Sequence, residues 1–268
     1  MLLARALLLT LTLGILLAPL AAEAQQPGKV SRVGILGDKA SDPAEARLWR
    51  AFRLGLQERG WIEGGNILIE YRWVEGNAAR LPELADDLVR LKLDLIATRG
   101  SLFTRAAKEA TSSIPIVFVA HADPVGTGHI ASLARPGGNI TGLALLQTEL
   151  GPKGLEFLSS VVPVAKRIAV LWHPGTPSHP PGLKALEEAG RTLRVQLQAV
   201  GARTGAELEG AFSAMARERA QAVLVLATPF FFTERQRVAE LAFTHRLDRK
   251  STRLNSSHSR ASRMPSSA

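Results

Sequence analysis

The sequence has no cysteine among its 268 residues. This absence excludes disulfides, thiolate metal sites, a cysteine nucleophile and a lipid-modified N-terminal cysteine. Aromatic residues are also few, at 5% of the chain, whereas the 46% hydrophobic and 21% charged content is ordinary for a globular protein. We therefore expect a fold stabilised by its hydrophobic core alone, and at this length the chain can form one large domain or two modest ones.

Catalytic and cofactor motifs are missing as well. The sequence contains no G-x-S-x-G nucleophile elbow, no P-loop and no H-E-x-x-H zinc motif. Gly34 and Gly37 do not complete a G-x-G-x-x-G dinucleotide fingerprint. We therefore predict no catalytic residue, no metal site and no cofactor, and we expect a binding protein and not an enzyme.

The sequence has an apolar run at its N-terminus that is typical of a signal peptide or a membrane anchor. Arg5 precedes the apolar segment Ala6–Leu17, and residues 22–24 (A-E-A) provide a cleavage site. A membrane anchor is the alternative, but the run is shorter than the roughly 20 residues that a spanning helix needs. We predict that residues 1–24 are a cleaved signal peptide and that the mature protein is exported to the periplasm.

Much of the formal net charge of +9 lies near the C-terminus. Residues 249–268 contain five Arg and Lys side chains and no acidic residue, and they have too few apolar residues to offset the entropy of ordering. One hypothesis is a natural basic tail for nucleic acid or anionic lipid. The other, which we favour, is a disordered, non-native tail on a truncated gene. Without this tail and the signal, 27 basic and 23 acidic side chains remain, so we predict no nucleic-acid partner.

Between residues 30 and 247, apolar strand-like runs alternate with amphipathic helix-like runs. The first series predicts strands at Arg32–Gly37, Asn66–Trp73, Leu93–Thr98, Ile114–Ala120 and Asn139–Leu145, and helices at Pro43–Arg59, Leu81–Leu91, Ser101–Thr111 and Gly126–Leu133. The second series predicts helices at Leu150–Val161, Pro181–Leu193, Gly205–Arg217 and Glu234–Leu247, and strands at Arg167–Trp172, Val195–Val200 and Ala222–Ala227. This rhythm is typical of βαβ units, so we predict two α/β lobes with parallel sheets, residues 25–146 and 147–248.

Ligands of open α/β sheets bind beyond the carboxyl ends of the strands. That rule selects the loops at residues 37–42, 98–101, 120–124, 172–178 and 228–231. Ser101 opens a helix, where a hydroxyl and free backbone N–H groups suit a carboxylate or another anion. Thr228 is followed by Pro229 and three Phe residues that could form an apolar wall. The alternative is that Ser101 is only a helix cap and that the phenylalanines belong to the core.

His121 and Asp123 share one of these loops, and His129 follows. Such residues can act as metal ligands or as an acid–base pair. More often, polar groups of this kind satisfy the neighbouring backbone. An exported α/β enzyme that uses His121 and Asp123 is therefore one alternative function, and a ligand-sensing domain of a signalling system is another.

Two runs of residues, taken together, support a family resemblance. The first is residues 52–76 (FRLGLQERGWIEGGNILIEYRWVEG), and the second combines residues 123–125 (DPV) with residues 133–142 (LARPGGNITG). With shorter matches elsewhere, they cover nearly everything from residue 30 to about residue 247. On these residues the chain resembles the ABC transporter substrate-binding proteins of the type-I periplasmic-binding group, whose relatives are associated with amino-acid uptake.

The resemblance implies two Rossmann-like lobes that close over a small solute, and a closed form that docks on an ABC permease in the inner membrane. It also implies that the second lobe is truncated, because members of the group continue beyond residue 248. We expect the chain to be a monomer. The ligand-binding residues that the resemblance implies, by position, are Asp38, Ser41, Arg99, Gly100, Ser101, His121, Asp123, Thr228 and Phe230. Arg99, Ser101 and Asp123 would suit a zwitterion such as an amino acid.

Overall fold

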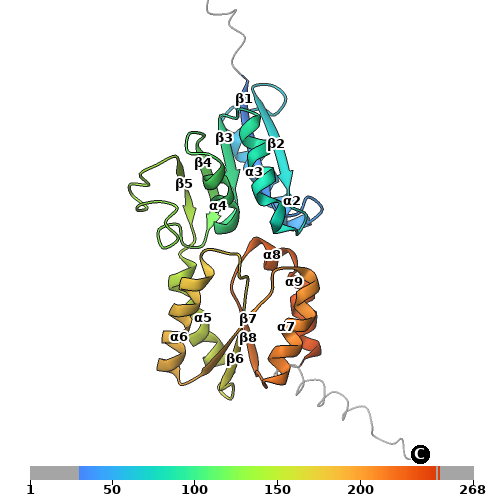
Figure 1. Ribbon diagram of the computed structural model, residues 1–268, viewed down its shortest axis with the longest axis vertical. Helices are drawn as coiled ribbons and strands as arrows, with labels where there is room; N and C mark the ends of the chain where they lie inside the picture. Colours follow the sequence, from blue (N-terminus) through green and yellow to red (C-terminus); the bar gives the residue numbers. More distant parts are fainter. Residues whose placement is uncertain (1–29, 246, 248–268) are drawn as a thin grey trace, which may run out of the picture.

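The computed structural model describes residues 30–245 and residue 247. The predicted signal peptide and the predicted tail both lie outside these residues. The described part of the chain forms two α/β lobes that are stacked end to end (Figure 1). Within that part, no helix is both long enough and apolar enough to cross a bilayer.

The first lobe is built on a parallel sheet with the strand order β2-β1-β3-β4-β5. Its strands are β1 (Ser31–Gly37), β2 (Ile67–Trp73), β3 (Leu95–Thr98), β4 (Ile116–His121) and β5 (Ile140–Ala144). Its helices are α2 (Pro43–Gln57), α3 (Leu81–Arg90) and α4 (Gly100–Ala110), and the short 3₁₀ helix η2 (Ala78–Arg80) precedes α3.

Both faces of the first sheet are covered, which is why its central strands are continuous apolar runs. Successive residues of a strand point to opposite faces. In β1, Ile35 accordingly packs with Trp49 of α2, whereas Leu36 packs with Leu88 of α3 on the other face. All four side chains are at most 2% exposed.

The second lobe has a smaller parallel sheet with the order β7-β6-β8. Its strands are β6 (Arg167–Trp172), β7 (Gln196–Gly201) and β8 (Ala222–Val225). Its helices are α5 (Gln147–Val161), α6 (His179–Leu193), α7 (Gly205–Arg217), α8 (Pro229–Thr233) and α9 (Arg235–Thr244). Core side chains again lie on both faces, with Leu186 of α6 on one side and Phe212 of α7 on the other. The predicted α/β class with two parallel sheets is confirmed.

Two predicted helices differ from the structure. The segment Gly126–Leu133 is a series of turns and bends, so the helix predicted there is wrong. Local bonds explain the difference: Asp123 Oδ1 accepts from the N–H of Gly126 at 2.7 Å, and Gly128 has a left-handed φ of 68°. The helix predicted from residue 234 is α9, and it is preceded by α8, which the sequence analysis treated as a loop.

The described chain passes from the first lobe to the second at residues 145–147. Leu146 has a left-handed backbone (φ 49°, ψ 39°) and precedes α5. The N–H groups on either side of it are fixed to the end of β4: Leu145 donates to the carbonyl of His121, and Gln147 donates to the carbonyl of Ala122, both at 2.8 Å. The connection between the lobes is therefore attached to the loop that follows β4.

Candidate functional site

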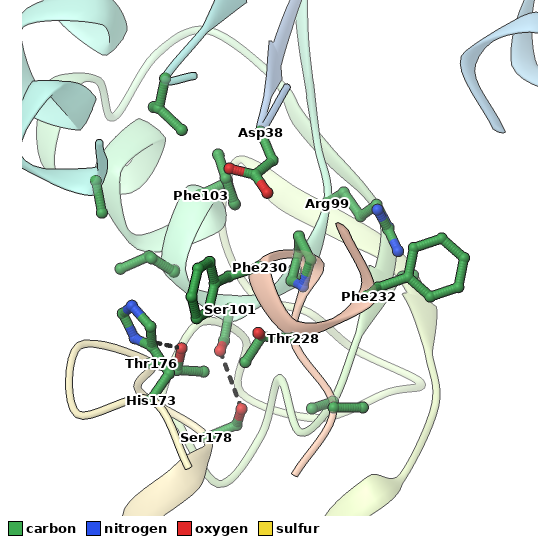
Figure 2. Close-up of a pocket in the computed structure, with 18 of the residues that line it drawn as sticks. Asp38, Arg99, Ser101, Phe103, His173, Thr176, Ser178, Thr228, Phe230 and Phe232 are labelled. Carbon is green, nitrogen blue, oxygen red and sulfur yellow. Dashed lines mark hydrogen bonds between the residues drawn. The ribbon is translucent and has the colours of Figure 1, made fainter. Parts of the chain in front are cut away.

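A cavity of about 250 Å³ lies where the two lobes face each other. Residues that follow every strand of the first sheet line it, and so do residues that follow all three strands of the second. Parallel strands direct their carboxyl ends to one edge of a sheet, and ligands bind beyond that edge. In this protein the two carboxyl edges face one another, so the cavity joins the two lobes (Figures 1 and 2).

The walls of the cavity are mainly apolar. They include Val74, Leu102, Phe103, Leu145, Pro229 and Phe230. The Phe230 ring points into the cavity (Figure 2) and packs against the ring of His173, with 5.6 Å between the ring centroids. A concave, mainly apolar space with a few convergent polar groups is the usual form of a small-molecule site.

Hydroxyl groups from both lobes meet at the first turn of α4. Ser101 Oγ of the first lobe lies 3.0 Å from Ser178 Oγ of the second, and Ser101 is only 2% exposed (Figure 2). When two hydroxyls share one hydrogen bond, the proton of the accepting hydroxyl is left to donate elsewhere. The N-terminus of α4 adds unpaired N–H groups and a partial positive charge. This corner of the cavity suits a carboxylate.

Asp38 follows β1 and is almost fully buried, at 4% exposure. Its Oδ2 accepts a hydrogen bond from the Thr233 hydroxyl of the second lobe at 3.1 Å. Burial raises the pKa of this carboxyl to about 6, although the bond from Thr233 lowers it in part. A cationic group of a ligand would favour the charged carboxylate, so Asp38 suits an ammonium group.

Arg99 also lines the cavity, but other residues engage its guanidinium. It forms an ion pair with Glu45, a carboxylate that is 1% exposed and that also accepts from Trp49 Nε1 at 2.9 Å. The Arg99 guanidinium lies over the ring of Phe232 as well, 4.9 Å from its centroid. Among the described residues, Arg203 is a lining cation with no carboxylate at ion-pair distance, and it comes from the second lobe.

Three of the predicted binding residues lie away from the cavity wall. Ser41 is exposed in the turn before α2, and Asp123 caps the turn at Gly126. His121 is fully buried behind the wall. The other six, Asp38, Arg99, Gly100, Ser101, Thr228 and Phe230, line the cavity.

His121 belongs to a buried pair of neutral imidazoles. Its Nδ1 accepts from the N–H of Asp123 at 3.1 Å, which leaves the proton on Nε2, and Nε2 faces His129 Nδ1 at 2.7 Å. Burial lowers the pKa of His121 to about 3 and that of His129 to about 4. These rings stabilise the loop after β4 and offer no acid–base group to the cavity.

The second lobe repeats this arrangement after β6. His173 Nδ1 accepts from the N–H of Gly175 at 3.1 Å, and the His173 N–H donates to His179 Nδ1 at 2.9 Å. Burial lowers the pKa of His179 to about 4. His173 differs from His121 in one respect, because it reaches the cavity wall.

Several of the lining residues were not among the predicted ones. Val74 and Gly76 follow β2, and Arg203 follows β7, so the rule on strand ends would have found them if it had been applied to every predicted strand. Phe103 lies within α4, so predicting it requires knowing which face of that helix points to the cavity. Ser178 belongs to a loop that was selected, although the residue was not named. Within the described part of the chain, no group of three or more His, Cys, Asp or Glu side chains could hold a metal ion.

The two facing lobes and the cavity between them define the fold class as that of the type-I periplasmic binding proteins. More specifically, the profile of the family "ABC transporter substrate binding protein" matches residues 39–244, so the chain belongs to this family. The predicted family is thereby confirmed.

Individual relatives agree with this assignment. A tyrosine-binding protein of Clostridioides difficile is 27% identical over 188 residues, which are 70% of this chain and 53% of that protein. The chain therefore spans about half the length of this curated relative. A conserved domain protein of Vibrio cholerae has a TM-score of 0.73 at 25% identity over 81% of this chain and 72% of its own.

A third relative shares the fold at lower identity. It is the ABC domain from Streptococcus pneumonia, solved in complex with L-Trp, with a TM-score of 0.70 at 18% identity over 80% of this chain and 71% of its own.

Proposed function

We propose that this protein is the extracytoplasmic solute-binding receptor of an ABC importer, and that its solute is an amino acid or a related carboxylate. One observation carries the proposal: the cavity joins apolar walls to polar groups that come from both lobes. A solute that contacts both lobes only when they are closed favours the closed state, and this is the switch that such a receptor needs.

The cavity supports a particular orientation of the solute. Its carboxylate would lie at the N-terminus of α4, near the hydroxyls of Ser101 and Ser178. Its ammonium group would face Asp38, and its apolar part would pack against Phe103 and Phe230. The names of the relatives, a tyrosine-binding protein and a domain in complex with L-Trp, favour an aromatic amino acid.

The remaining parts of the proposal follow from this role. The signal at residues 1–24 would export the chain to the periplasm, and the closed form would dock on a permease in the inner membrane. We expect the receptor to act as a monomer, because both lobes of one chain form the cavity.

The alternatives have less support. An enzyme that uses His121 and Asp123 would need both groups in the cavity, but His121 is fully buried and neither residue lines the wall. The family is one of solute-binding proteins. A ligand-sensing domain would use the same cavity, and no separate observation favours it.

Calorimetry and thermal-shift measurements on the purified chain test the proposal. L-tyrosine, L-tryptophan, L-leucine and benzoate would be compared with tyramine, which lacks the carboxylate. We expect an amino acid to bind and to raise the melting temperature, and tyramine to bind at least tenfold more weakly. If no solute stabilises the protein while a chromogenic ester or phosphate is hydrolysed, the receptor function is wrong.

A further inference from the structure

The segment from Pro229 to Arg235 reaches across the cleft from the second lobe to the first. The Thr233 hydroxyl donates to Asp38, and Arg235 lies 3.5 Å from Asp42, the residue that caps α2. At its other end, Pro229 packs on Gly100, where an added Cβ would lie 3.1 Å from Pro229 Cδ. Residues 229–235, which we call the clasp, therefore contact the first lobe along their length.

Phe232 lies at the centre of the clasp between two arginines. Arg99 of the first lobe is 4.9 Å from the ring centroid, and Arg235 of the second lobe is 5.1 Å from it. Figure 2 shows the ring beside Arg99 at the edge of the cavity, whereas Phe230 points inward. Phe232 is 41% exposed, so burial in the core does not account for its position.

The charges around this ring are arranged to hold it there. Two guanidinium groups near one ring would repel each other, but each has its own carboxylate: Arg99 pairs with Glu45, and Arg235 pairs with Asp42. Both carboxylates belong to the first lobe and are almost fully buried, at 1% and 7% exposure. A cation over an aromatic ring is attracted to the ring face, and the attraction grows as the pair is removed from water. The contact between Arg99 and Phe232 can therefore shift an equilibrium between open and closed lobes.

We propose that Phe232 is a positioning residue that holds the cleft shut, and that it acts through Arg99 on the opposite lobe. Its effect on solute release rests on the proposed receptor function, whereas its effect on lobe closure does not. Opening the cleft breaks the contact with Arg99 but keeps the contact with Arg235, because Arg235 moves with the ring. The clasp consequently sets how long a solute stays bound.

Lobe closure can be measured directly, because the absence of cysteine leaves no background labelling. Spin labels at Arg47→Cys in α2 and Glu240→Cys in α9, both exposed and outside the clasp, report the separation of the lobes. In the solute-free protein, Phe232→Ala should lower the ratio of closed to open molecules roughly three- to tenfold.

Three further variants separate the ring contact from other effects. Phe232→Leu keeps an apolar side chain but has no aromatic ring, so it should lower the ratio of closed to open molecules as Phe232→Ala does. Phe232→Trp keeps an aromatic ring and should keep the wild-type ratio. The matched control is Phe243→Ala, which removes a 62% exposed ring of α9 outside the cavity and should change nothing. An unchanged distance distribution in both the Ala and the Leu variant would overturn the proposal.

Solute release gives the second readout, with L-tyrosine as the probe in stopped-flow measurements. Phe232→Ala should raise the dissociation rate constant roughly three- to tenfold and leave the association rate constant nearly unchanged. A slower association with an unchanged dissociation rate constant would show that Phe232 contacts the solute on entry, and would contradict the proposal. If the wild-type chain binds no solute, the receptor function fails, and the distances in the solute-free protein still decide the role of Phe232.

Discussion

The two lobes share one local device and differ in size. Each places a buried histidine at the end of a strand: His121 is the last residue of β4, and His173 directly follows β6. In each, the Nδ1 accepts from the backbone N–H two residues later. The first sheet has three strands with a neighbour on both sides, whereas among the described residues only β6 of the second sheet does. The same loop geometry is therefore supported by sheets of unequal size.

The two lobes supply different groups to the cavity. The larger lobe supplies the buried Asp38 and the N-terminus of α4. The smaller lobe supplies Phe230 and the clasp, whose contacts can form and break. We infer that the first lobe supplies the carboxylate for an ammonium group and the helix N-terminus for a carboxylate, and that the second lobe adds Ser178 and moves against it.

Acid should produce the largest effect, and it tests whether the histidine loops are equivalent. The pKa values of His121, His129 and His179 are about 3, 4 and 4 in the folded protein, below the 6.5 of a free imidazole. The unfolded chain therefore binds more protons below pH 6.5, and the free energy of unfolding falls by roughly 1 kcal/mol per pH unit for each histidine as the pH drops towards 4.

Asp38 acts in the opposite direction, because its folded pKa of about 6 lies above 3.8 and its protonation stabilises the fold as the pH falls below 6. Urea unfolding between pH 7.5 and 4.5 measures the sum, and hydrogen exchange divides it between the lobes. Stability that is constant from pH 7 to pH 5 would refute the buried neutral histidines. Exchange that changes in one lobe alone would show that the two loops are not equivalent.

Truncating one core aromatic in each lobe tests the difference in sheet size. Phe118 of β4 and Phe212 of α7 are both 0% exposed, so Phe118→Ala and Phe212→Ala should each cost about 3–5 kcal/mol. Because the second sheet is smaller, Phe212→Ala should let that lobe unfold while the amides of β1 and β3 stay protected. Hydrogen exchange measured by mass spectrometry would show this, and equal loss of protection in both lobes would mean that they unfold as one unit.

Replacing Asp38 tests whether the first lobe supplies the carboxylate that binds an ammonium group of the solute. Asp38→Asn keeps an oxygen that can accept from Thr233 but removes the negative charge. We expect the affinity for an amino acid to fall about 10- to 100-fold, equivalent to one to two broken charged hydrogen bonds. Binding of benzoate, which has no ammonium group, should change little. Calorimetry with both solutes checks this, and an equal loss for both would assign Asp38 to packing.

The smallest effect should come from a glycine at the junction of the lobes. Gly100 has a φ of 79°, and a Cβ there would meet Pro229, so Gly100→Ala should cost about 1–2 kcal/mol. Gly210 in α7 is the matched control, because a Cβ there would meet nothing within 4 Å and alanine favours the helix. In thermal unfolding, the melting temperature should fall for Gly100→Ala and rise for Gly210→Ala.

Most of the fold could be predicted from the sequence, because the spacing and the length of apolar runs depend only on residues that are neighbours in the chain. Helix α7 was predicted at its observed bounds, and the apolar run of β6 was as well. The turns at residues 126–133 were not predicted, because the carboxylate of Asp123 and two glycines outweigh the helical spacing of the apolar residues. Helix α8 is five residues long and depends on the Thr228 hydroxyl at its start, so no periodicity could reveal it.

The candidate site was predictable to the extent that it follows strand ends. Asp38, Ser101 and Thr228 line the cavity because each lies within three residues of the end of a strand. His121 could not be placed by that rule, because the strand ends there but the side chain turns to His129 behind the wall. The pairing of Arg99 with Glu45 joins residues 54 positions apart, and only the folded chain brings them together.

The connection at residues 145–147 has a mechanical consequence. The Gln147 N–H is bonded to the Ala122 carbonyl of the first lobe, so turning the chain at Leu146 breaks that hydrogen bond, at a net cost of about 0.5–1.5 kcal/mol. Leu146 already has a left-handed backbone that costs a non-glycine residue about 1–2 kcal/mol, so a rotation there can release energy and not only consume it. Such a pivot offers little elastic resistance to opening, so the contacts of the clasp, residues 229–235, carry the load that keeps the lobes together.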